Sequence, residues 1–436
     1  MRTEVFADLE KPSRSVSVLD EVPTDLSFSQ AGPAERGGVG WLLNFWRPVV
    51  LVLLCLDIPI LALGRLYLPG DISFGFVSFT RNIAILLVLG VWLGVPGLPR
   101  PHSRLTLPFL LFFLCAWVSV ALGGGAWGEV RWLGFALAFF YGIRSIAVSA
   151  SGRQFLFHWL GVLAVASVLA EIWLHPEVLH FDQMRRNEMA TGHPNIIAGF
   201  FAILAPVFLG RREKEFWQRG LSLLYFGFAV FGVLMTFSRL SFAGLGVGIV
   251  AVALAHWSRR FPARAWLLSG AGVVLVGSFV LYLSEGRLEA DENRLRIMQT
   301  SWSVFTEHWF WGVGWGSNNL KPFFVERYDS IFGTALWFYH SHNMYLEILV
   351  ATGVVGATAA VLVFVRLGDL ARRAWRLLDV EASQAGSVVG LIASLLVFLW
   401  LGLGEVPIYY ARTLFPLVVV WSLLEGWVEA RGGKGA

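Results

Sequence analysis

The chain has 436 residues, of which 56% are hydrophobic, 15% aromatic and only 15% charged. With a mean hydropathy of +0.64, this composition excludes a soluble globular protein and predicts an all-α polytopic membrane protein. The formal net charge of +4 does not argue for nucleic-acid binding, because arginines of membrane proteins gather in cytoplasmic loops.

The N-terminal residues 1–40 mix acids, bases, Ser, Pro and Gly and contain no apolar stretch. We expect a disordered cytoplasmic tail, with no cleavable signal peptide ahead of the first span. The two cysteines, Cys55 and Cys115, lie in apolar segments and do not suggest a disulfide framework. Asp57 is the one acid near the middle of a predicted span, and we assign it a structural or cavity role.

The apolar segments predict about twelve transmembrane helices when roughly 20 residues are allowed for each span. Nine fall within residues 41–284 and three within residues 342–430; their centres lie near residues 55, 88, 113, 138, 164, 202, 227, 247, 274, 354, 395 and 419. If the N-terminus is cytoplasmic, each cytoplasmic loop is basic, as the positive-inside rule requires. Both termini are therefore expected in the cytoplasm.

One predicted connection, residues 285–341, is far longer than the others, and loops of that length are usually functional. We expect it on the periplasmic side. Apolar residues recur in it at spacings of three and four: Leu295, Met298, Trp302, Phe305 and Trp309. This period predicts an amphipathic helix. Tryptophan on its apolar face favours a helix lying along the membrane surface, and packing on the bundle is a compatible alternative.

The long connection ends in "HSHNMYLEILVATGVVG", residues 340–356. His340, His342 and Asn343 therefore stand where a helix begins, and a helix N-terminus keeps a nearby imidazole neutral. A neutral histidine can act as a general base near neutral pH. The alternatives are a passive polar cap and a metal pair with Glu347. Zinc requires three or more ligands in tetrahedral geometry, and residues two apart on a helix do not share a face.

Arginines supply the second group of candidates. Arg239 interrupts the apolar sequence "LMTFSRLSFAGLGVG", and an arginine in such a place needs an anionic partner. Guanidinium binds phosphate bidentately, so a phosphorylated ligand is favoured over structural pairing with Glu171. Arg185 and Arg186 lie on the same predicted side before the sixth span, as further phosphate contacts or as a surface charge run.

These residues resemble the O-antigen ligase and polymerase superfamily, whose members are membrane glycosyltransferases that move glycans from undecaprenyl-pyrophosphate carriers on the periplasmic side. The ligase signature is His, then Asn, Ser or Gln, nine residues, Gly, two residues, and Gly, Thr or Tyr. Here His342 and Asn343 are followed by nine residues, Gly353, two valines and Gly356. The signature is complete.

Weaker parts of the sequence are also similar to this family. In "NRLRIMQTSWSVFTEHWFWGVGWGSN" an arginine, Arg294, precedes an amphipathic helix and a Gly-x-Gly turn. The turn is formed by Gly312 and Gly314 or by Gly314 and Gly316. The pair Ser238 and Arg239 and the spacing of Arg186 and Asn195 resemble the family as well.

The resemblance implies a lipid-carrier-dependent, inverting glycosyl transfer that uses no cofactor, metal or nucleotide. It implies that His342 removes a proton from an acceptor hydroxyl and that arginines hold the pyrophosphate, namely Arg186, Arg239 and Arg294. His340, Asn343, Asn195 and Arg185 would support them. It also implies an active site on the periplasmic side of the bacterial inner membrane.

The favoured reaction transfers O-antigen to lipid A core in lipopolysaccharide biosynthesis. A polymerase, whose acceptor is a second carrier-linked glycan, is a close alternative. A protein O-oligosaccharyltransferase is less favoured, because those enzymes often carry a substantial additional soluble domain. A polysaccharide or lipid transporter is also less favoured, because transporters tend to show internal repeats and we find none here.

Overall fold

The structure is a computed structural model that describes residues 103–123, 125–174, 176, 194–211, 215–257, 288–334, 340–379 and 382–432. Within these ranges the chain forms helices and no strand. The predicted tail (1–40), Asp57 and the predicted spans near residues 55, 88 and 274 lie outside the described residues. Each of the other predicted span centres falls inside a described helix.

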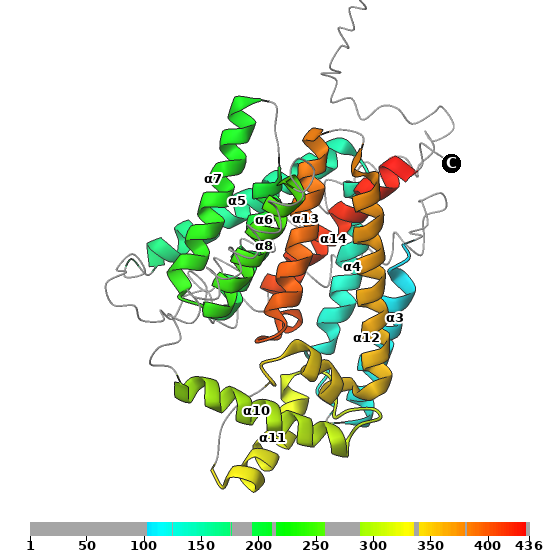
Figure 1. The fold of residues 1–436 in the computed structure, drawn as a ribbon. Coiled ribbons are helices and arrows are strands. Elements are labelled where there is room, and N and C mark those ends of the chain that lie inside the picture. Colours follow the sequence, from blue (N-terminus) through cyan, green and yellow to red (C-terminus); the bar gives the residue numbers. More distant parts are fainter. Residues whose placement is uncertain are drawn as a thin grey trace, which may run out of the picture. The chain divides into compact units, whose positions relative to one another are not determined.

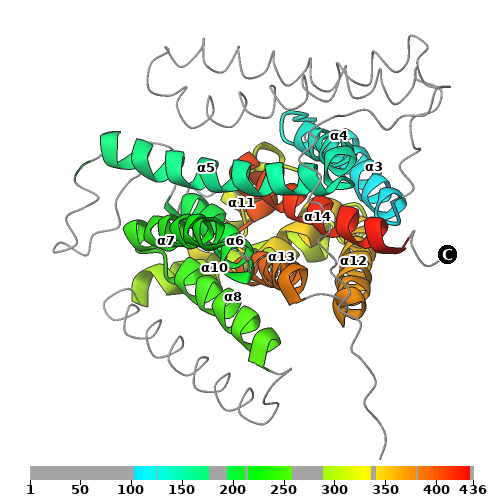
Figure 2. The same ribbon diagram turned by 90° about the horizontal axis from the view of Figure 1, so that it is seen from above.

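The described helices are all shown in Figure 1. In chain order they are α3 (Thr106–Leu122), α4 (Val130–Ala147), α5 (Ala150–Leu174), α6 (Pro194–Gly210), α7 (Phe216–Thr236), α8 (Arg239–Trp257), α10 (Leu288–Glu307), α11 (Ser317–Phe332), α12 (Met344–Arg376), α13 (Ala382–Leu401) and α14 (Ala411–Gly432). Two short 3-10 helices are η4 (Leu377–Asp379) and η5 (Pro407–Tyr409). Helix α5 is strongly inclined to its neighbours (Figures 1 and 2).

Helix α6 is the central helix of the described part. Nearly all of its residues are buried, and it packs against α7, α8, α13 and α14. Its contact with α13 is close because both helices carry glycine there: a Cβ built on Gly390 would lie 2.4 Å from the carbonyl oxygen of Pro206. Small residues allow such backbone approach between membrane helices. The first turn of α6, which begins with Pro194 and Asn195, is therefore held firmly inside the protein.

Four described helices are long and apolar enough to cross a membrane by length and composition: residues Ala150–Trp173 of α5, α7, α12 and residues Thr413–Arg431 of α14. Shorter apolar helices are Thr106–Leu122, Pro194–Gly210, Arg239–Ala255 and Gly386–Leu401. Large apolar side chains on α5 face outward, among them Val162 and Leu169, as expected for a surface in contact with lipid. These features point to a chain that crosses the membrane several times.

Ion pairs between arginines and acids gather at one end of the bundle. Arg144 lies 3.2 Å from Glu425 and 2.9 Å from Glu429. Arg104 approaches Asp369, which also pairs with arginines at the end of α12. Helices α10 and α11 lie at the opposite end (Figure 1). The bundle therefore has one basic, ion-paired end and one end covered by the long connection.

The long connection contains two helices where the sequence predicted one. Helix α11 begins at Ser317, whose backbone N–H donates to a carboxylate oxygen of Glu129 at 2.6 Å, and it ends before Gly333, whose φ of 63° is left-handed. Its buried apolar residues are Leu320, Phe324 and Tyr328. Their spacing of four is the helical signal that our sequence reasoning missed.

Helix α10 packs on the protein through a face different from the predicted apolar one. Its buried residues are Ile297, Thr300, Ser301 and Val304. On the predicted face, Leu295 is 67% exposed, and Trp302 is 54% exposed. Because α10 runs across the end of the bundle (Figure 1), its inner face contacts protein while its outer face keeps exposed tryptophan and leucine. Exposed tryptophan and leucine are compatible with a helix that lies along a membrane surface.

Candidate functional site

Asn343 fixes where α12 begins. Its side-chain oxygen accepts hydrogen bonds from the backbone N–H groups of Tyr345 and Leu346, both at 3.0 Å, which is the role that makes asparagine a preferred N-cap residue. Its Nδ2 donates to the carbonyl oxygen of Leu403 at 3.2 Å. The motif asparagine therefore caps α12 and also ties it to the segment that follows α13.

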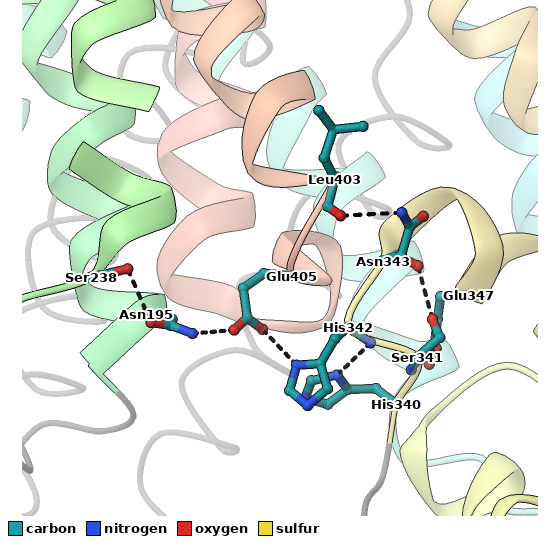
Figure 3. Close-up of polar contacts among 9 residues, drawn as sticks. All are labelled: Asn195, Ser238, His340, Ser341, His342, Asn343, Glu347, Leu403 and Glu405. Atoms are coloured by element: carbon teal, nitrogen blue, oxygen red, sulfur yellow. Dashed lines mark hydrogen bonds and ion pairs between the residues drawn. The ribbon is translucent and has the colours of Figure 1, made fainter. Parts of the chain in front are cut away.

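Glu347 connects the histidine loop, which we define as residues 340–343, to the first turn of α12 (Figure 3). Its carboxylate accepts hydrogen bonds from the backbone N–H and the hydroxyl of Ser341, each at 2.6 Å, and both residues are fully buried. A buried carboxylate needs such partners. The alternative of a metal site that pairs the histidines with Glu347 is therefore wrong. The Glu347 carboxylate is hydrogen-bonded to Ser341, and a different acid faces the histidines.

The two histidine rings lie against each other. Their centroids are 4.2 Å apart, and Nδ1 of His340 accepts a hydrogen bond from the backbone N–H of His342 at 3.3 Å. His342 has a φ of 53°, which is uncommon for a residue other than glycine. Backbone strain of this kind gathers at functional sites. Here it turns the His342 ring toward the segment between α13 and α14 (Figure 3).

The acid that faces His342 is Glu405. Its Oε2 lies 3.7 Å from Nδ1 of His342, an ion-pair distance, and its side chain is 8% exposed against 22% for His342. Its Oε1 accepts a hydrogen bond from Nδ2 of Asn195. Asn195 in turn accepts one from the hydroxyl of Ser238 at 3.0 Å. One polar chain therefore links α8, α6, Glu405 and the start of α12 (Figure 3).

Glu405 is held as an anion. Burial by itself raises the pKa of its carboxyl group, but the neighbouring His342, the charge of His340 and the hydrogen bond from Asn195 together lower that pKa to about 2. The N-termini of α6, α8 and α12, where partial positive charge accumulates, bear the residues around it. The carboxylate therefore stays ionised at neutral pH and is too weak a base to take a proton from an alcohol.

Among the described residues, His340, His342 and Glu405 also have a spacing that a metal ion could use, since their ligand atoms lie within 4.8 Å of one another. However, Nδ1 of His340 already accepts a hydrogen bond, and Nδ1 of His342 faces the Glu405 carboxylate. We therefore describe the group as a histidine pair with a carboxylate, and we assign no metal to it.

The motif glycine Gly353 breaks α12. Its φ of 62° and ψ of −169° are non-helical, and the turn after α10 docks at the break. Backbone hydrogen bonds join Val354 to Trp309, Val313 to Val350 and Gly314 to Ala351. A Cβ at Gly353 would lie 2.1 Å from the carbonyl oxygen of Phe310. Gly353 therefore admits the backbone of a turn, and not a neighbouring helix.

The turn itself depends on glycine. Gly312, Gly314 and Gly316 have φ values of 73°, 110° and 110°, a region that glycine alone adopts readily. Gly356 has a different role, because a Cβ there would lie 2.2 Å from the hydroxyl of Thr352 in the same helix. The predicted Gly-x-Gly turn and the motif glycine Gly353 thus belong to one packing unit.

We expect Gly353→Ala to destabilise the protein strongly. The backbone conformation alone costs a non-glycine residue roughly 1–3 kcal/mol, and the new methyl group would displace the Phe310 backbone. Thermal unfolding in detergent should show a lower Tm. The matched control is Gly368→Ala on the same helix, where a Cβ meets nothing within 4 Å; its Tm should be unchanged or slightly higher. Equal Tm values for the two variants would contradict this packing.

The predicted arginines are placed unevenly. Arg239 is the first residue of α8, half-buried and directly after Ser238 of the polar chain. Arg294 is half-buried on α10, which packs against α11 and α12. It is not one of the residues of the polar chain. Arg185 and Arg186 lie outside the described residues. Of the predicted site residues, the structure brings together Asn195, His340, His342 and Asn343.

Glu405 is the site residue that sequence reasoning missed. It stands in "LGLGEVPIYY", residues 401–410, where an acid directly after Gly404 and two positions before Pro407 interrupts apolar sequence. A charge in such surroundings is a functional candidate by default, the argument that singled out Arg239. Glu405 was therefore recognisable from the sequence on the same physical ground as Arg239.

A family model described as O-antigen ligase matches residues 224–361 of the chain. The match includes Ser238, Arg239, Arg294 and the histidine loop, while Asn195 and Glu405 lie outside it. None of the curated proteins compared with the chain matches it. The family match agrees with the complete His-Asn-Gly-Gly signature and with the apolar helices of the described part.

Proposed function

Because this chain is a member of the O-antigen ligase and polymerase superfamily through residues 224–361, we propose that it moves a glycan from undecaprenyl pyrophosphate to an acceptor hydroxyl. The family implies a membrane glycosyltransferase-like enzyme with a lipid-linked glycan donor and a glycan acceptor in general terms. The more specific proposal is an inverting, metal-independent transfer on the periplasmic face of the inner membrane. The preferred acceptor is lipid A core.

One observation carries the proposal. The signature histidine, His342, stands in a strained, partly exposed position where the N-termini of α6, α8 and α12 meet. Helix N-termini attract phosphate oxygens, and a partly exposed imidazole can reach a bound hydroxyl. An anion-binding region beside a base is what transfer from a pyrophosphate carrier requires.

In the proposed reaction, His342 accepts the proton of the acceptor hydroxyl. The oxygen forms a bond to the anomeric carbon of the glycan, and the bond between that carbon and the pyrophosphate oxygen breaks. The electron pair leaves with the pyrophosphate. Arg239 holds the pyrophosphate as its negative charge increases, together with Arg186 and Arg294. Because attack and departure take place on opposite sides of the carbon, the configuration inverts.

Arg239 supports this assignment by its place at the first turn of α8, next to Ser238. An arginine there adds its charge to the partial charge of the helix N-terminus, and its planar fork matches phosphate geometry. His340 orients the loop or the acceptor through its contact with His342, while Asn343 and Asn195 fix the helix starts that surround the site.

The proposed reaction can be tested by incubating the purified protein with an undecaprenyl-pyrophosphate-linked glycan and either lipid A core or a second carrier-linked glycan. The mixture contains EDTA and no nucleotide. We expect transfer to lipid A core at the same rate as in a mixture without EDTA. Transfer only to the second carrier-linked glycan would identify a polymerase. Activity that requires added zinc would contradict the proposed metal-independent reaction, and no transfer to either acceptor would contradict the proposal itself.

The proposed topology gives a separate prediction. In a variant without native cysteines, Asn318→Cys on α11 should react with a membrane-impermeant thiol reagent in cells with a permeable outer membrane. Gly368→Cys on α12 should react only after the inner membrane is broken. Both positions are exposed. Asn318 is preferred to the neighbouring Gly316, where the Cβ of a cysteine would lie 3.0 Å from Glu129. The reverse labelling pattern would contradict a periplasmic site.

A further inference from the structure

We propose that Glu405 is a positioning residue for His342, holding the ring in the tautomer and orientation that leave Nε2 free to take the acceptor proton. This inference rests on the proposed function and deepens it. Glu405 lies outside the segment that matches the family, and its place is set by the loop between α13 and α14.

The geometry of the His342 ring supports this role. Its Nδ1 is buried and has no hydrogen-bond partner among the described residues, but it faces Oε2 of Glu405 at 3.7 Å. A neutral imidazole carries its proton on one nitrogen only. An anion facing Nδ1 favours the proton there, since N–H is attracted to the carboxylate and a lone pair is repelled. The basic lone pair is then on Nε2.

Glu405 is itself fixed from the other side. Nδ2 of Asn195 donates to Oε1 of Glu405, and Oδ1 of Asn195 accepts from the hydroxyl of Ser238 at 3.0 Å. The orientation of the Asn195 amide is consistent with both bonds at once. Because Asn195 stands at the start of the buried central helix, the carboxylate has little freedom to move away from His342. The second carboxylate oxygen is thereby held toward the ring.

The loop that bears Glu405 is also anchored to α12 and α8. The backbone N–H of Met344 donates to the carbonyl oxygen of Gly402 at 2.8 Å. Nε1 of Trp400 donates to the carbonyl oxygen of Leu240 at 3.2 Å. Together with the bond from Asn343 to Leu403, these contacts hold the loop on both neighbouring helix starts. The separation of Glu405 from His342 is thus set by the backbone on both sides.

This arrangement has a consequence for the proton transfer. When the hydroxyl proton moves to Nε2, the ring becomes an imidazolium cation, and the facing carboxylate stabilises it. Among the described residues, the other titratable or charged groups near the ring are His340 on the same loop, Glu347 in the first turn of α12, Tyr410 before α14 and Arg239 at the start of α8. The ring of Tyr410 lies 6.5 Å from that of His340. The Glu347 carboxylate is hydrogen-bonded to Ser341, so the carboxylate that faces the His342 ring and stabilises positive charge on it is that of Glu405.

The first test compares Glu405→Gln with wild-type protein over a range of pH. The amide keeps the size and loses the charge, so we expect kcat to fall roughly 10²-fold or more with little change in KM for the donor. The acid limb of the pH–rate profile should move to lower pH, because the imidazolium form loses its stabilising anion. Glu429→Gln, at the ion-paired opposite end, is the matched control and should leave both kcat and the profile unchanged.

A second readout does not depend on glycan transfer. Diethyl pyrocarbonate modifies neutral imidazole, and mass spectrometry can follow the peptide that contains His342. We expect half-maximal modification of His342 at lower pH in Glu405→Gln than in wild type. Identical modification profiles would overturn the pairing, even if Glu405→Gln were inactive. A shifted profile in a protein that transfers no glycan would support the pairing and contradict the proposed function.

Discussion

His342→Ala is expected to lose nearly all glycan transfer while still binding the carrier lipid. A positioned general base accounts for a factor of roughly 10²–10⁴ in rate, and removing the imidazole leaves the acceptor proton without a nearby base. The fold should tolerate the change, because the side chain is partly exposed and the loop is held by Ser341 and Asn343. Transfer and donor binding should be measured separately, the latter with radiolabelled carrier-linked glycan.

His340→Ala is the matched comparison on the same loop. It removes the neighbouring ring and the acceptor of the His342 N–H, so it should reduce the rate less than His342→Ala does. Two results would contradict the base assignment: a wild-type transfer rate in His342→Ala, or a loss of donor binding that accounts for its inactivity. The second would mean that His342 contacts the pyrophosphate.

Arg239→Lys should also greatly reduce transfer while expression and Tm stay near those of wild type. Lysine keeps the charge but lacks the planar fork that binds phosphate bidentately. Because the charge on the pyrophosphate increases as the glycosidic bond breaks, the loss should appear mainly in kcat. The measurement is steady-state transfer at saturating donor.

Arg366→Lys makes the same chemical change at an exposed position near the opposite end of the bundle and should leave transfer unchanged. Full activity in Arg239→Lys or in Arg239→Ala would show that this residue is not a pyrophosphate clamp. A fall in Tm that parallels the fall in activity would instead assign Arg239 to the support of α8.

The sequence was sufficient to predict the local features of the site. A histidine and an asparagine before an apolar run predicted a helix start, and the structure shows Asn343 as the N-cap of α12. The helical spans were predictable because apolar composition alone determines them. The burial pattern of α10 was not, because Thr300 and Ser301, two of its buried residues, are polar and leave no apolar period in the sequence.

The contacts between distant segments were not predictable in the same way. Asn195 and Glu405 are 210 positions apart in the chain, and only the packing of α6 against α13 brings them together. The role of Gly353 was also hidden, because the sequence shows a small residue in a helix and not the turn that docks against it. In both cases the missing information was which backbone segments touch.

The most direct test of the central claim is the stereochemistry and carrier product of a single round of transfer by the purified protein in EDTA. We predict that the new glycosidic bond has the anomeric configuration opposite to that of the donor, and that one undecaprenyl pyrophosphate is released for each bond formed. Retention of configuration, which indicates a covalent glycosyl-enzyme intermediate, would contradict direct attack by a hydroxyl that His342 deprotonates.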